Sequence, residues 1–305
     1  MEKVKIAVIG AGVGGMSAAI YALRANADVT VFEQAGVGGL TATIDKIENY
    51  PALGVVEGWE LADKMAKHAT SLGMQTTREK VLSVLPQEGN FVLKTNKSEY
   101  IFNAVVVATG TRHNKLGVED AYVGKGVSYC ATCDGNFFRN KPVVVAGSGN
   151  QAVKEALYLA GICKTVYFVA AEEIEAEQVN LDLLASFDNV RFLQGWVTEL
   201  SGEERLEKVV VATKDSQKTT LEANALFVAV GSKPSLDFLQ DVDVERVNGF
   251  LKVDDRSQTS LTGLFAAGDC TSGPLKQIVT ACGDGAKAGT FAVAYAKAQL
   301  KKASK

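Results

Sequence analysis

One sequence pattern occurs twice in this chain and constrains the fold more than any other feature. The segments "VKIAVIGAGVGGMSAAIYALRANADVTVFE" and "KPVVVAGSGNQAVKEALYLAGICKTVYFVA" both read as strand, Gly-rich turn, helix and strand. Their first turn glycines, Gly10 and Gly147, are offset by 147 − 10 = 137 positions. Each copy later reaches an apolar strand that ends in a glycine turn, "AVVVATG" and "ALFVAVG". The repeat predicts an α/β protein with two doubly wound, Rossmann-like domains.

The two predicted domains need not follow one another along the chain. After the second copy closes near Pro234, the segment "GLFAAGDCTSGPLKQIVTACGDGAKAGTFAVAYAKAQ" reads as a strand, a turn and a helix without a new Gly-rich fingerprint. We infer that this segment completes the first domain and that the second, smaller domain is an insertion. The expected boundaries are residues 1–115 and 238–305 for the first domain and residues 116–237 for the inserted domain.

The first Gly-rich turn has the spacing of a dinucleotide-binding site. Gly10, Gly12 and Gly15 form G-x-G-x-x-G between a strand and a helix, which lets a pyrophosphate approach the backbone at the helix N-terminus. Glu33 ends the next strand, where its carboxylate is placed to accept hydrogen bonds from ribose hydroxyls. A Gly-rich turn with a purely structural role is the alternative, but the strand, helix and acid in register favour a dinucleotide.

The stretch "AAGDC" bears on which dinucleotide binds. Asp269 lies in a Gly-Asp turn after an apolar strand. This position suits a carboxylate on a ribityl hydroxyl, a group that FAD has and NAD lacks. An Asp that caps the following helix would produce the same sequence. The residue alone therefore leaves both interpretations open.

The sequence "CATCDG" places Cys130 and Cys133 either side of two residues. A structural zinc site needs four ligands, and the other cysteines are scattered singly while the only histidines are His68 and His113. No metal site is therefore expected, and a dithiol/disulfide pair is favoured. Asp134 is a candidate acid for protonating a departing thiolate, or else a turn or helix cap. The cysteines expected to be small packing residues are Cys163, Cys270 and Cys282.

The charge and the apolar pattern exclude several functions. The chain has 32 Lys and Arg against 35 Asp and Glu, so it lacks a global basic field for nucleic acid. No uncharged apolar run reaches the length of about 18 residues that a membrane helix needs, and the N-terminal sequence has no cleavable hydrophobic region. We expect a cytoplasmic protein with reduced thiols and one special cysteine pair.

Stretches along nearly the whole chain resemble the low-molecular-weight thioredoxin reductases, and CATCD in this frame is highly specific. The matching stretches are "GAGVGGMSAAIYA", "GVGGLT", "KIENYPAL", "VVVATGT", "SYCATCDGNFF", "AGSGNQAVKEALYL", "VAVGSKPS", "FAAGDC" and "LKQIVTACGDGAKAG". The resemblance implies an FAD domain interrupted by a smaller domain that carries the cysteine pair. It also implies a homodimer that reduces thioredoxin.

The resemblance further implies roles for individual residues. Cys133 would lie against the flavin, Cys130 would attack thioredoxin, and Asp134 would be the acid/base. Leu40 departs from the family, which often has Gln there, so no polar FAD contact is expected from it. The residues expected to contact FAD are Gly10, Gly12, Gly15, Glu33, Gly39, Asn49, Thr109, Gly110, Gly268, Asp269 and Gln277.

The second Gly-rich turn departs from the family pattern. Gly147, Gly149 and Ala152 keep the outline G-x-G-x-x-A. At the end of the next strand, however, the family typically reads His-Arg-Arg, whose cations bind the 2′-phosphate of NADPH. This chain reads "AAEE" at residues 170–173. A 2′-phosphate would therefore meet methyl groups and two carboxylates.

The chain thus resembles the ferredoxin-dependent flavin thioredoxin reductases, which lack the NADPH determinants. We expect FAD as the cofactor, thioredoxin as the electron acceptor and ferredoxin as the electron donor. An NADPH- or NADH-dependent thioredoxin reductase is the main alternative, with Glu172 as a ligand for the free 2′-hydroxyl of NADH. A non-enzymatic flavin-binding redox sensor and a flavin reductase acting on other disulfides are the further alternatives.

Overall fold

The structure is a computed structural model that describes residues 3–44 and 46–303, and its contacts divide the chain into two compact units. Within these residues the first unit covers 3–44, 50–112 and 233–303, and the second covers 46–49 and 113–232. Each unit holds a five-stranded parallel sheet with helices packed against it, as the repeat predicts.

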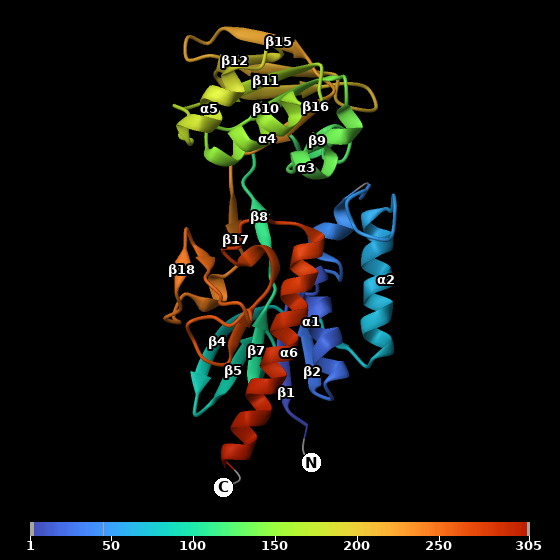
Figure 1. Cartoon of the computed structure of the whole chain (residues 1–305), viewed down its shortest axis with the longest axis vertical. Coiled ribbons are helices and arrows are strands. Elements are labelled where there is room, and N and C mark those ends of the chain that lie inside the picture. The colour runs from blue at the N-terminus through green and yellow to red at the C-terminus, as the bar shows by residue number, and fades with distance from the viewer. Residues whose placement is uncertain (1–2, 45, 304–305) are drawn as a thin grey trace. The chain divides into compact units, whose positions relative to one another are not determined.

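The first unit is built on a parallel sheet in the order β20-β7-β1-β2-β3 (Figure 1). Its central strands carry continuous apolar runs, "KIAVI" and "AVVV", because helices and loops cover both faces of the sheet. The bounds of the strands are Lys5–Ile9 (β1), Asp28–Phe32 (β2), Gln75–Thr77 (β3), Ala104–Val107 (β7) and Leu264–Ala266 (β20).

Helices α1 (Val13–Arg24) and α6 (Ile278–Ala303) lie side by side against this sheet (Figure 1). Gly285 and Gly289, one turn apart on α6, allow the close approach. A Cβ at Gly285 would lie 2.1 Å from the carbonyl oxygen of Gly14, and one at Gly289 would lie 2.2 Å from that of Ala18. Side chains at these two positions would therefore push the helices apart. Helix α2 (Gly58–Ser71) packs against α1.

The rest of the first unit consists of short elements around the sheet. An antiparallel sheet has the order β4-β5-β6, and β18 pairs with β19. The bounds are Val81–Gln87 (β4), Asn90–Thr95 (β5), Glu99–Phe102 (β6), Arg246–Val247 (β18), Phe250–Leu251 (β19), and the 3-10 helices Gly39–Thr43 (η1), Asp237–Leu239 (η4) and Gly268–Cys270 (η5).

The second unit repeats the same architecture on a smaller scale. Its parallel sheet has the order β12-β11-β10-β16-β9, and an antiparallel sheet has the order β13-β14-β15. The bounds are Val127–Ser128 (β9), Pro142–Ala146 (β10), Thr165–Ala170 (β11), Val190–Gln194 (β12), Trp196–Ser201 (β13), Lys208–Ala212 (β14), Lys218–Glu222 (β15), Ala225–Val228 (β16), Ala131–Asp134 (α3), Asn150–Ala160 (α4), Gln178–Ala185 (α5), Asp120–Tyr122 (η2) and Gly135–Phe138 (η3).

The chain passes between the units through two short strands, β8 (Thr111–His113) and β17 (Ser232–Pro234), which pair with each other. Among the described residues, no helix is both long enough and apolar enough to span a membrane.

Candidate active site

The first Gly-rich turn is shaped by close backbone contacts. Gly10 has φ +101°, and its N–H donates to the carbonyl of Phe32 (2.8 Å). A Cβ at Gly15 would lie 1.9 Å from the carbonyl oxygen of Gly10, so only glycine lets α1 begin this close to the turn. A Cβ at Gly12, by contrast, would meet no atom within 4 Å. Gly12 therefore borders open space at the start of α1, as a pyrophosphate cradle requires.

Glu33 is held beside this turn. Its carboxylate accepts the N–H of Ala11 (2.9 Å) and the N–H of Ala35 (2.8 Å). Gly39 approaches from the other side, because a Cβ there would lie 3.2 Å from the Cα of Gly12. The acid and the turn are thus brought together as the spacing predicts, with a carboxylate available to ribose hydroxyls.

Thr109 and Gly110 follow β7 at the same edge of the sheet as Gly10, because β1 and β7 are parallel. The hydroxyl oxygen of Thr109 is buried and has no hydrogen-bond partner among the residues that the structure describes. A buried polar atom without a partner calls for a ligand or a water. This orphan hydroxyl fits a polar cofactor bound across the carboxyl ends of β1 and β7.

Asp269 lies at this edge too, after β20, in the 3-10 helix η5 that Gly268 opens. Burial raises the pKa of Asp269; Lys276 opposes the shift and Asp284 adds to it. The Nζ of Lys276 donates to the backbone carbonyl of Asp269 (3.0 Å). Gln277 precedes α6, and its N–H donates to the hydroxyl of Thr280 (3.1 Å).

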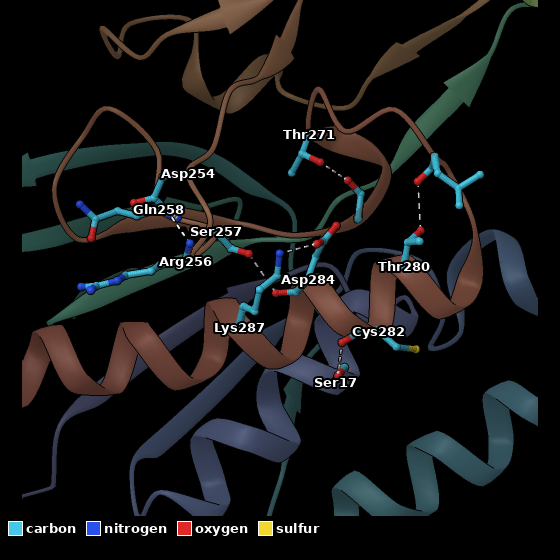
Figure 2. A network of polar contacts seen from close by, with 12 residues as sticks. Ser17, Asp254, Arg256, Ser257, Gln258, Thr271, Thr280, Cys282, Asp284 and Lys287 are labelled. Carbon is cyan, nitrogen blue, oxygen red and sulfur yellow. Dashed lines mark hydrogen bonds and ion pairs between the residues drawn. The ribbon is translucent and has the colours of Figure 1, made fainter. Parts of the chain in front are cut away.

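A polar network fixes the loop that carries Asp269 and the start of α6 (Figure 2). The Thr271 hydroxyl donates to the carbonyl of Gly268 (2.8 Å), and the Ser17 hydroxyl of α1 donates to the carbonyl of Cys282 (2.7 Å). Asp284 pairs with Lys287 (3.1 Å) on the same helix. The first contact closes the turn that carries Asp269, and the second ties the start of α6 to α1.

Asn49 is the one predicted FAD residue that does not group with the others. It lies in the segment 46–49, which the contacts assign to the second unit. Its expected contact with FAD remains a prediction.

The second Gly-rich turn forms the same backbone hydrogen bonds as the first, at equivalent positions of the repeat. The Gly147 N–H donates to the carbonyl of Val169 (3.0 Å), as the Gly10 N–H does to that of Phe32. The Glu175 N–H donates to the carbonyl of Ser148 (2.8 Å), as the Gly38 N–H does to that of Ala11 (2.8 Å). Both pairs keep the offset of the sequence repeat.

The side chains around this second turn differ from those around the first. Ala170 is buried at the end of β11, and Glu172 and Glu173 after it are exposed. The carboxylate of Glu177 accepts a hydrogen bond from the side chain of Asn150, the first residue of α4 (3.2 Å). One carboxylate, that of Glu177, therefore lies at the N-terminus of α4, where an anion would have to bind, and the Nζ of Lys154 lies 4.0 Å from it.

The cysteine pair lies in the second unit. Cys130 and Cys133 form a disulfide whose Cα atoms are 5.3 Å apart, within the usual range. Cys130 is the N-cap of α3, and its carbonyl accepts the N–H groups of Cys133 (3.2 Å) and Asp134 (3.1 Å). The Ser128 hydroxyl accepts the N–H of Cys130 (3.1 Å) and donates to the carboxylate of Asp134 (2.5 Å). The structure thus joins the predicted acid to the cysteine pair through Ser128, a residue that the sequence analysis missed.

The remaining cysteines lie elsewhere. Cys163 and Cys270 are buried, and desolvation raises the pKa of each thiol to about 11. Burial also raises the pKa of Cys282, which lies on α6. These thiols stay protonated at neutral pH and are unsuited to nucleophilic attack.

Comparison with known proteins places this geometry in a family. A sequence profile described as "Pyridine nucleotide-disulphide oxidoreductase" matches residues 4–285. The chain belongs to this family. A thioredoxin reductase of Treponema pallidum is 35% identical over 95% of this chain and 96% of its own length. A Clostridium pasteurianum protein described as the 34.2 kDa protein in the rubredoxin operon is 33% identical over 96% of this chain and 97% of its own length.

Among solved structures, the thioredoxin reductase of Streptococcus pyogenes matches with a TM-score of 0.93 and 33% identity, over 97% of this chain and all of that one. The protein is therefore a thioredoxin reductase-type flavoprotein disulfide oxidoreductase of the low-molecular-weight family. Proteins of this family use FAD, so the predicted cofactor and the predicted Rossmann-like fold are confirmed.

Proposed function

We propose that this protein reduces thioredoxin through FAD and the Cys130–Cys133 dithiol, with electrons from reduced ferredoxin. The observation that carries the choice of donor is the stretch Ala170-Ala171-Glu172-Glu173 at the end of β11, where the family has a cationic clamp. A cytoplasmic location and a homodimer, both expected from the sequence, belong to the same proposal.

The electrostatics of the second turn disfavour NADPH. A 2′-phosphate carries nearly two negative charges and needs cationic partners. Glu172 and Glu173 stand where those partners would act, and Glu177 contacts the first residue of α4. The loss of two charge-assisted contacts, at roughly 1.5–3 kcal/mol each, weakens binding about a hundredfold or more before repulsion is added.

A one-electron donor is compatible with the rest of the site. Bound FAD supplies the conversion between single-electron and paired-electron transfer. The residues that would hold it are those at the carboxyl edge of the first sheet, where Gly12 would leave room for the pyrophosphate, Glu33 would accept from a ribose and Asp269 would accept from the ribityl chain. A relative from Clostridium pasteurianum is described as a protein of the rubredoxin operon, which is compatible with a redox-protein donor here.

The exchange with thioredoxin uses the two cysteines in sequence. The Cys130 thiolate attacks one sulfur of the thioredoxin disulfide, which breaks that bond and forms a mixed disulfide. Asp134 in its protonated form gives a proton to the departing thioredoxin thiolate, and its carboxylate then takes the proton of the Cys133 thiol. The Cys133 thiolate attacks the Cys130 sulfur, which re-forms the Cys130–Cys133 disulfide and releases the second thioredoxin sulfur as a thiolate that solvent protonates. The Ser128 hydroxyl keeps Asp134 beside the pair throughout.

Anaerobic stopped-flow mixing with NADPH, NADH or reduced ferredoxin tests the donor. We expect reduced ferredoxin to bleach the flavin absorbance rapidly and micromolar NADPH to leave it unchanged. Rapid bleaching by micromolar NADPH would overturn the ferredoxin proposal while leaving the thioredoxin reductase assignment intact. Bleaching by NADH alone would instead identify Glu172 as the ribose ligand.

A further inference from the structure

A buried glutamate lies against the helical turn that carries the cysteine pair. Glu155 is on α4, and α4 packs against α3. Its carboxyl accepts hydrogen bonds from the backbone N–H of Ala131 and from the side-chain amide of Gln151 (3.1 Å). Its second oxygen, Oε2, is buried and has no hydrogen-bond partner within residues 3–44 and 46–303. None of the roles described above uses this side chain.

The contact with Ala131 connects Glu155 to the chemistry of the sulfurs. Ala131 lies between Cys130 and Cys133 and is the first residue of α3. Free N–H groups at the start of a helical turn stabilise a cysteine thiolate and lower its pKa. Here one of those N–H groups faces a carboxyl instead. An ionised Glu155 would therefore oppose a thiolate twice, by occupying this donor and by like-charge repulsion.

Burial raises the pKa of Glu155 into the neutral range, where its carboxyl can bind or lose a proton. Desolvation raises its pKa from 4.5 to about 7, although the hydrogen bonds from Gln151 and Ala131 act in the opposite direction. A carboxyl with this pKa binds or loses a proton when a charge appears beside it.

Among the described residues, Glu155 forms no ion pair with a lysine, arginine or histidine. The elements packed against α4 are α3, α5, β10 and β11. Asp134 on α3 is bonded to Ser128, Asp182 on α5 is bonded to Gln178, and the strands β10 and β11 carry no Asp, Glu, Lys or Arg. Lys154 on α4 itself lies 4.0 Å from Glu177.

We propose that Glu155 is the proton partner of the Cys130–Cys133 pair, ionised beside the disulfide at alkaline pH and protonated when one of the two sulfurs becomes a thiolate. It acts through the pair and is a positioning residue. The inference rests on the proposed redox role of the two cysteines.

The proposed step balances in electrons and protons. Two electrons break the S–S bond, and two protons are taken up with them. One proton converts one sulfur to a thiol, and the other converts the Glu155 carboxylate to a carboxylic acid, while the second sulfur stays a thiolate. The net charge of the group is the same before and after.

The alkylation rate of the reduced pair tests this coupling. The flavoprotein is reduced with a phosphine, and the phosphine is removed under argon. The reduced protein is then treated with iodoacetamide at pH values between 5.5 and 9. Peptide mass spectrometry measures the alkylation of Cys130 and Cys133 over time. The variants are Glu155→Gln and, as a matched control, Asp182→Asn, which removes an exposed acid of the same unit. Glu155→Asp retains a titrating carboxyl.

The expected result is a ratio of variant to wild-type alkylation rates that changes with pH. The rate for Glu155→Gln divided by the wild-type rate should be near one at pH 5.5, where Glu155 is protonated in the wild type. It should rise toward pH 8.5, because the wild-type thiolate competes with the Glu155 carboxylate for one shared proton and glutamine does not compete. A coupling of roughly half a unit to one unit in the thiol pKa sets an upper limit of about threefold to tenfold on the ratio. Asp182→Asn should give a ratio near one throughout, and Glu155→Asp should stay closer to the wild type than Glu155→Gln does.

Other outcomes separate the two proposals. A ratio for Glu155→Gln that is constant across the pH range overturns the coupling. If Cys130 and Cys133 remain unalkylated after phosphine treatment, the proposed redox function fails instead. Should Glu155→Gln not fold, the reduced-minus-oxidised infrared spectrum of the wild type decides, because the proposal requires a protonated carboxyl to appear on reduction at pH 8.

Discussion

The Ser128 hydroxyl donates a hydrogen bond to the Asp134 carboxylate, with 2.5 Å between the two oxygens. The same hydroxyl accepts the N–H of Cys130 (3.1 Å), so one side chain links the proposed acid to the proposed attacking cysteine. Ser128 ends strand β9, which pairs with β16 in the parallel sheet. The acid is therefore positioned from the sheet and does not depend on the short turn α3 alone.

Replacement of Ser128 by Ala should slow thioredoxin reduction. A hydrogen bond to a charged group contributes roughly 1.5–3 kcal/mol, and about 1.4 kcal/mol corresponds to a tenfold rate change. We expect kcat for thioredoxin to fall about tenfold, with flavin content and the number of reducible cysteines unchanged. Ser186→Ala, which removes an exposed hydroxyl bonded to the carbonyl of Leu183, is the control. An unimpaired kcat in Ser128→Ala would show that Asp134 needs no anchor.

The two Gly-rich turns should respond differently to the same substitution. A Cβ at Gly12 or at Gly149 would meet no atom within 4 Å, so both positions have space for the start of a side chain. Gly12→Val should block the approach of the pyrophosphate and abolish FAD binding, measured as flavin absorbance per protein. Gly149→Val should keep its FAD and its ferredoxin-driven turnover. Full flavin content in Gly12→Val would contradict the first site, and lost turnover in Gly149→Val would indicate a nucleotide at the second.

Much of the fold follows from the sequence because it depends on local spacing. The 137-residue offset between Gly10 and Gly147 reappears in the hydrogen bonds that each glycine makes to the next strand. Glu33 lies beside the first turn because parallel strands end at one edge of the sheet, which a strand-turn-helix-strand pattern already implies. These relationships need no knowledge of how helices pack.

The contacts that depend on packing could not be predicted in this way. Glu155 meets Ala131 only because α3 and α4 pack against each other, and the sequence shows only an acid in an apolar helix. Ser128 reaches Asp134 because the chain turns between β9 and α3. The only hint in the sequence was a hydroxyl two residues before the first cysteine. The segment containing Asn49 groups with the second unit for a similar reason, since no local pattern marks it.

The unfolding free energy of the oxidised protein should depend on pH because Glu155 is buried. Its pKa is raised from 4.5 to about 7 in the folded state, so its favourable contribution is complete below pH 4.5 and lost as the pH rises through 7. Glu155→Gln removes the cost of ionising a buried group and should raise the unfolding free energy at pH 8 by up to about 3 kcal/mol. At pH 5 the difference should be much smaller.

Scanning calorimetry of the oxidised protein measures this effect as a difference in melting temperature between the variant and the wild type. The difference should grow from pH 5 to pH 8, whereas Asp182→Asn should give a difference that does not change with pH. An equal stabilisation by Glu155→Gln at both pH values would mean that the residue does not titrate in this range.

A cationic clamp introduced at the second turn should restore the use of NADPH. Ala171 and Glu172 follow β11 and are exposed, so arginine side chains fit there without disturbing the core. The double variant Ala171→Arg, Glu172→Arg removes one carboxylate and supplies two guanidinium groups for the 2′-phosphate. Two charge-assisted contacts correspond to a gain in NADPH affinity of about a hundredfold or more. Isothermal titration calorimetry with NADPH and NADH measures the gain, and Ala171→Gln, Glu172→Gln separates the removal of repulsion from the added contacts. If the arginine variant binds NADPH no better than the glutamine variant, the missing clamp is not what excludes NADPH from this unit.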